Sequence, residues 1–133
     1  MTGSHESSAG SAWDWLARAR GSLSLAKVAK PSGGYYEDLC FQAQQAAEKA
    51  LKAACMAKGI TFRFTHDIEE LGSALAQRGM EVPACVREAV VLTRYAVETR
   101  YPGCYEASTE AELEEAVNLA EGVIEWVERL IEP

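Results

Sequence analysis

Hydrophobic residues recur along most of the chain at spacings of three and four, which is the period of an α-helix. No stretch alternates apolar and polar residues between turn signals, as a half-buried strand would. The pattern predicts helices at about residues 12–29, 35–58, 65–78, 83–99 and 108–131. Short connections between such helices favour antiparallel neighbours, so we expect an all-α, up-and-down helical bundle of four main helices plus a shorter fifth.

Capping residues mark the starts of two of these helices. Either Thr65 or Asp67 is suited to cap the third helix, and Asp67 with Glu70 has the spacing of a capping box. Thr109 and Glu112 repeat that spacing where the last helix should begin. Both positions are therefore expected to satisfy free backbone N–H groups with side-chain oxygens.

The length and composition indicate a single domain. The chain has 133 residues, 48% of them hydrophobic, enough for one sizeable core. Residues 1–10 are rich in Ser and Gly and predict a disordered leader, which leaves 11–133 as the helical domain. No apolar run is long enough to span a bilayer and no secretory signal is evident, so we expect no membrane association and a cytoplasmic location.

The four cysteines contain no C-x-x-C pair, and their spacing fits neither a zinc site nor a redox motif. Buried free thiols in a reducing cytoplasm are expected instead. We expect no metal and no cofactor. The four positions are Cys40, Cys55, Cys85 and Cys104.

The net charge of −7 is unevenly distributed. Residues 104–133 hold nine acids and one base, Arg129, which gives −8 and leaves +1 for residues 1–103. The acidic segment is either a solvated helix face or an acidic docking surface. Because the rest of the chain is nearly neutral, the overall charge does not argue against phosphate binding there.

The second predicted helix has two unlike faces. One is dominated by alanine, which lets another helix approach closely. The other carries Phe41, Gln45, Glu48 and Lys52 at spacings of four, three and four residues. This polar line either lines a binding site or is a solvated face.

Two further residues are candidates for anion binding. His66 lies near a predicted helix N-terminus, where free N–H groups and the helix dipole favour a phosphate. Arg100 follows the end of a helix and is suited to a bidentate phosphate contact. Arg63, Arg94 and Tyr101 are plausible neighbours.

Three segments, 41–52, 65–71 and 99–102, together resemble the HEPN (higher eukaryotes and prokaryotes nucleotide-binding) domain family in its prokaryotic form, over about residues 11–131. The resemblance implies an up-and-down bundle, commonly a homodimer. It also implies a nucleotide- or partner-binding module working with a minimal nucleotidyltransferase in a two-component, toxin–antitoxin-like system. The nucleotide-binding residues expected on this basis are Glu48, Lys52, His66, Arg100 and Tyr101.

Some members of this family are metal-independent ribonucleases whose arginine and histidine, separated by about four to six residues, act in acid–base cleavage beside the 2′-hydroxyl. In this sequence Arg63 and His66 have two residues between them, and no histidine follows Arg100. The prediction is therefore a binding module rather than an enzyme. Two alternatives stay open, a ribonuclease in which His66 and Arg100 meet in the fold and bind RNA, and a structural dimerisation domain.

Overall fold

A computed structural model describes residues 8–98, 101, 103 and 105–132. All regular secondary structure in these residues is helical, which confirms the all-α prediction. The elements are α1 (Ser8–Ala26), α2 (Tyr36–Ala57), α3 (Ile68–Gln77), α4 (Ala84–Ala89), the 3₁₀ helix η2 (Val90–Thr93), α5 (Arg94–Glu98) and α6 (Glu110–Ile131).

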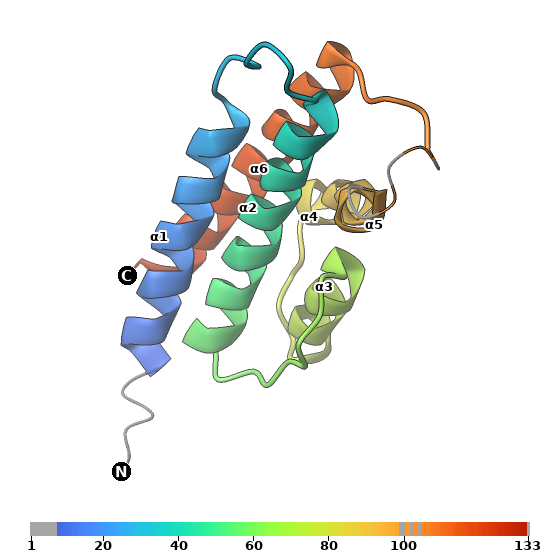
Figure 1. Cartoon of the computed structure of the whole chain (residues 1–133). Helices are drawn as coiled ribbons and strands as arrows, with labels where there is room; N and C mark the ends of the chain where they lie inside the picture. Colours follow the sequence, from blue (N-terminus) through green and yellow to red (C-terminus); the bar gives the residue numbers. More distant parts are fainter. Residues whose placement is uncertain (1–7, 99–100, 102, 104, 133) are drawn as a thin grey trace.

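The long helix α2 is the centre of the bundle. It packs against α1 and α6 on one side and against α3 and α5 on the other, as Figure 1 shows, and it also contacts η2. α1 and α2 are antiparallel neighbours, and α6 lies behind them and contacts both (Figure 1). A side chain on α2 that does not face solvent is therefore covered by one of these two groups of helices or by the connections between the helices.

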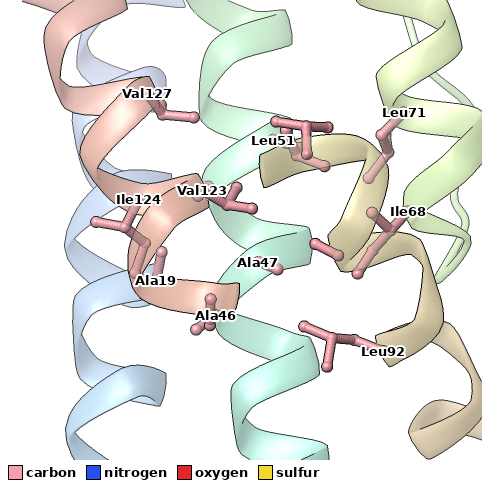
Figure 2. Close-up of a cluster of buried hydrophobic side chains, with 14 of the residues drawn as sticks. Ala19, Ala46, Ala47, Leu51, Ile68, Leu71, Leu92, Val123, Ile124 and Val127 are labelled. Carbon is pink, nitrogen blue, oxygen red and sulfur yellow. The ribbon is translucent and has the colours of Figure 1, made fainter. Parts of the chain in front are cut away.

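Small residues on α2 allow this close packing. Ala46 and Ala47 are fully buried and lie among side chains from α1, α6 and the α3–η2 region (Figure 2). Because alanine adds little width to the helix, the larger residues of the neighbouring helices fill the space. The labelled members of this core are Ala19, Ala46, Ala47, Leu51, Ile68, Leu71, Leu92, Val123, Ile124 and Val127.

The segment predicted as one helix over 83–99 is divided in the structure. α4 gives way to the 3₁₀ turn η2 before α5 continues, with Pro83 as the N-cap of α4. The turn places the Thr93 hydroxyl where it accepts a hydrogen bond from the Ile68 backbone N–H at 3.1 Å. That N–H belongs to the first turn of α3 and has no acceptor within its own helix, so η2 ties α5 to the start of α3.

The capping box predicted at α3 is wrong. Asp67 is the N-cap, and its side chain accepts from the Glu69 N–H at 3.0 Å. Glu70 does not complete the box, because its carboxylate instead accepts from Arg63 Nε at 2.6 Å and Nη2 at 3.0 Å. A charge-assisted bidentate pair is stronger than a bond to a neutral backbone N–H, which accounts for the difference.

The capping box predicted at α6 is confirmed. Thr109 is the N-cap and its hydroxyl accepts from the Glu112 N–H at 3.1 Å, while the Glu112 carboxylate accepts from the Thr109 N–H at 2.8 Å. The acidic segment is largely exposed along this helix, and three of its carboxylates form ion pairs with neighbouring helices. These pairs are Glu112–Arg94, Glu121–Lys27 and Glu128–Arg20.

Two further findings concern the expected N-terminal leader and membrane-spanning helices. α1 begins at Ser8, inside the stretch 1–10 for which a disordered leader is expected; residues 1–7 lie outside the described part. Among the helices that the structure describes, none is long and apolar enough to cross a membrane.

The expected burial of the free thiols is confirmed for two of the three cysteines that the structure describes. Cys40 and Cys55 are free and buried, and burial raises the pKa of each thiol to about 11. Cys85 is free and partly buried. Cys104 lies outside the described residues.

Candidate functional site

Glu48 and Lys52 form a buried ion pair on α2. Lys52 Nζ lies 2.7 Å from Glu48 Oε2. The Lys52 side chain is only 2% exposed and the Glu48 side chain only 4%. The interpretation of the polar line as a solvated face is therefore wrong for these two residues. A buried charge is strongly disfavoured unless it is paired and hydrogen-bonded, so the surroundings of this pair must supply further partners.

Aromatic rings surround the Lys52 ammonium. Its Nζ lies 5.3 Å from the centre of the Trp15 ring on α1, and 5.9 Å and 5.3 Å from the rings of Phe62 and Phe64 in the connection between α2 and α3. Ring faces carry partial negative charge and attract a cation at such distances. The rings thus exclude water from Lys52 while partly compensating for its lost hydration.

The second oxygen of Glu48 gathers three more partners. Oε1 lies 3.0 Å from His66 Nδ1, 3.0 Å from Gln44 Nε2 and 3.1 Å from Gln45 Nε2. Gln44 Nε2 also donates to the backbone carbonyl of His66 at 3.0 Å, so it holds the α2–α3 connection against α2. We refer to Gln44, Glu48, Lys52 and His66 as the Glu48 cluster.

The ionisation of Glu48 determines the proton positions in this cluster. Burial acts to raise the pKa of Glu48, but hydrogen bonds from Lys52, His66 and Gln44 outweigh burial and lower the pKa below its usual range. The ionised carboxylate only accepts hydrogen bonds, so His66 Nδ1 must donate. The other ring nitrogen, Nε2, is then free to act as a hydrogen-bond acceptor or base when the ring is neutral.

Only one charged or titratable member of the cluster reaches solvent. The His66 side chain is 38% exposed, whereas Glu48 and Lys52 are buried. A ligand therefore touches His66 first, and the ion pair acts as its support. Phe64, 89% exposed, lies beside the His66 ring with the ring centres 6.1 Å apart.

The helix-dipole site expected at His66 is largely occupied by the protein's own acceptors. Three N–H groups at the start of α3 already have acceptors: Asp67 N donates to Thr65 Oγ1, Ile68 N to Thr93 Oγ1 and Glu69 N to the Asp67 carboxylate. An anion would have to displace these bonds. His66 is positioned by Glu48 and Gln44 instead, which depends on α2 and not on the dipole of α3.

The structure does not gather every predicted site residue in this cluster. Arg100 lies outside the described residues. Tyr101 is 54% exposed, and within the described residues no hydrogen bond or ion pair joins it to the Glu48 cluster. Arg63 is held by Glu70, and Arg94 by Glu98 and Glu112.

Sequence reasoning missed Gln44 as a member of the site. The polar face predicted for this helix contains Gln45 and not Gln44. However, Gln44, Glu48 and Lys52 follow one another at strict spacings of four residues. That spacing places them on one face of α2, and it is the signal that identifies Gln44. The described residues contain no group of three or more His, Cys, Asp or Glu side chains able to hold a metal ion.

The fold and this cluster define a small all-α bundle with a buried charge pair behind a half-exposed histidine. The family model for the HEPN domain matches residues 12–130. The chain is similar to the crystal structure of an archaeal HEPN homologue, with a TM-score of 0.70 and 33% sequence identity. The match covers 91% of this chain and 98% of that one. None of the curated proteins matches. The chain belongs to the HEPN domain family.

Proposed function

We propose that this chain is a nucleotide-binding HEPN module in which His66 makes the ligand contact and Glu48 and Lys52 position it. The observation that supports the proposal is the His66 ring, half exposed and held at Nδ1 by a buried, ionised carboxylate. A nucleotide phosphate or base edge would meet the Nε2 side of that ring. Arg100 and Tyr101 are included as further ligand contacts, on the family resemblance alone.

Calorimetry with a panel of nucleotides tests this function. His66→Ala should weaken binding about tenfold or more, since a hydrogen bond to a charged group is worth about 1.5–3 kcal/mol. Gln77→Ala, at an exposed position at the end of α3, is the control and should bind as the wild type does. Absence of binding to every nucleotide by the folded wild-type protein would contradict the proposal.

The proposal extends to partners. Family membership supports a homodimer that works beside a minimal nucleotidyltransferase in a toxin–antitoxin-like pair. Light scattering measures the oligomeric state, and co-purification with the product of the adjacent reading frame measures the pairing. If the protein is a monomer at micromolar concentration and forms no complex with a nucleotidyltransferase, both proposed partners are wrong. Nucleotide binding is tested separately, by calorimetry.

A second candidate function is metal-independent RNA cleavage, and the His66–Glu48 contact of 3.0 Å favours it. In this reaction the neutral imidazole takes the proton of a 2′-hydroxyl while that oxygen attacks the adjacent phosphorus, and the P–O5′ bond breaks as the 5′-oxygen takes a proton from water. Glu48 would hold the tautomer whose Nε2 is the base. An arginine to stabilise the phosphorane charge would have to be Arg100 or a residue of a second copy.

Incubation of the purified protein with single-stranded RNA in the presence of a metal chelator tests the second candidate. Cleavage that is lost in His66→Ala and strongly reduced in Glu48→Gln would establish it, with Gln77→Ala again as the control. RNA that stays intact with the wild-type dimer would exclude this activity without affecting nucleotide binding.

A further inference from the structure

A concave surface lies between α1 and α2, next to the Glu48 cluster. It has a volume of about 440 Å³ and is lined by Asp14, Trp15 and Arg18 from α1 and by Lys49 and Met56 from α2. We refer to it as the α1–α2 pocket. Figure 1 shows the two helices side by side along their length. None of the pocket's residues belongs to the predicted nucleotide site.

Lys49 is the cation that α2 contributes to this pocket. Its side chain is half-buried, and Nζ donates to the hydroxyl of Ser22 at 2.9 Å. In the described part of the chain no carboxylate lies within ion-pair distance of Nζ. Burial is the main cause that lowers the pKa of Lys49; the charge of Glu48 raises it, and the charges of Arg18 and Lys52 lower it. A bound anion would favour the charged form of this half-buried ammonium.

Arg18 supplies a second positive charge. Its Nε lies 3.4 Å from Asp14 Oδ2, and both side chains are about two-thirds exposed. An exposed pair of this kind contributes little to stability and breaks at small cost. The guanidinium is therefore free to turn toward an anion at Lys49, and its fork of N–H donors suits a phosphate.

Trp15 connects the pocket to the Glu48 cluster. Its ring lines the pocket and also lies 5.3 Å from Lys52 Nζ. We propose that the α1–α2 pocket binds the phosphate of a nucleotide through Lys49 and Arg18, with the base against Trp15. The inference rests on the proposed nucleotide-binding function; it assigns the phosphate to Lys49 and Arg18 and leaves the base edge as the group that meets His66 Nε2.

Tryptophan fluorescence reports on this pocket directly. The chain has three tryptophans, and a Trp13→Phe, Trp126→Phe background leaves Trp15 as the only one. Ribonucleoside 5′-diphosphates, the corresponding nucleosides and inorganic pyrophosphate are titrated separately. The diphosphates should change Trp15 emission and bind about tenfold or more tightly than the nucleosides, and pyrophosphate should compete with them.

Single substitutions test which charged side chains of the pocket contribute to diphosphate binding. Lys49→Met keeps the half-buried stem and should weaken diphosphate binding about tenfold or more, since a charge-assisted bond is lost. Arg18→Gln, at a largely exposed position, should weaken it severalfold, and Asp14→Asn should strengthen it. Lys30→Met removes one positive charge from the α1–α2 connection, far along the chain from the pocket, and should bind within about twofold of wild type.

The outcomes separate failure of the pocket inference from failure of the proposed nucleotide-binding function. Diphosphate binding that His66→Ala weakens but Lys49→Met and Arg18→Gln leave unchanged would overturn the pocket and retain the function. Binding of pyrophosphate but of no nucleotide, lost in Lys49→Met, would support an anion pocket and contradict the nucleotide-binding function. If neither diphosphates nor pyrophosphate changes Trp15 emission, the pocket inference is wrong.

Discussion

Glu48 and Lys52 lie four residues apart on α2, and their charged atoms meet at 2.7 Å with both side chains almost fully buried. On an exposed helix such a pair contributes about 0.2–0.5 kcal/mol. Here the α2–α3 connection and α1 close over it, so removing one charge leaves the other buried without a counter-charge. The pair therefore matters far more for stability and for the position of His66 than its spacing alone implies.

Glu48→Gln should lower the free energy of unfolding by about 3–5 kcal/mol, because the Lys52 ammonium then stays buried without its carboxylate. Urea unfolding monitored by circular dichroism measures the change. Asp14→Asn is the matched control, since Asp14 and Arg18 are also four residues apart but exposed, and it should change stability by less than about 1 kcal/mol. Equal effects of the two substitutions would mean that the Glu48–Lys52 pair is not buried in solution.

Acid should destabilise the protein partly through Glu48. Its pKa is lowered in the folded state, so the folded protein holds this proton less readily than the unfolded chain. The stabilisation is thus fully present above the ordinary value of 4.5 and is lost as the pH falls through the lower folded value. Urea unfolding between pH 7 and pH 3 measures the slope.

Glu48→Gln serves as the comparison for this pH dependence, because it removes the titrating group. Its stability should fall less steeply below pH 4.5 than that of the wild type. Glu70 and Glu112 also have lowered pKa values and should produce a remaining slope in both proteins. Identical slopes would show that Glu48 does not contribute.

Thr109→Ala should destabilise the protein by about 1 kcal/mol, because it removes the side-chain acceptor of the α6 capping box. The measurement is again urea unfolding at neutral pH. Thr61→Ala, at an exposed position in the α2–α3 connection, is the matched control and should stay within about 0.5 kcal/mol of wild type. A negligible effect of Thr109→Ala would indicate that the start of α6 is held by other contacts.

Thiol labelling tests the burial of Cys40 and Cys55. Both have pKa values raised to about 11 by burial, so little thiolate is present at pH 8. In a Cys104→Ser background, native protein should react slowly at these two residues and faster at the partly buried Cys85. All three should react rapidly in urea. Fast labelling of Cys40 or Cys55 in the native protein would contradict the packing around α2.

The candidate site was only partly predictable. The sequence placed Glu48 and Lys52 on one face of a helix, and it indicated His66 by its place near a predicted helix N-terminus and by the HEPN resemblance. It could not place the His66 ring, because a contact between residues 18 positions apart depends on the path of the α2–α3 connection. The sequence also did not indicate that Lys49 is half-buried, since nothing in its local pattern distinguishes it from a solvated lysine.

Local physics accounts for what the sequence determined by itself. Helical periodicity, breakers and the Thr109–Glu112 box act within a few residues, and they predicted the all-α fold and the positions of most helices, but not the division of 83–99 into α4, η2 and α5. Tertiary structure decided which polar residues are buried. Whether Glu48 and Lys52 face water depends on the rings of Trp15, Phe62 and Phe64 from other segments. Burial is a property of the assembled bundle, so a helix read alone cannot reveal it.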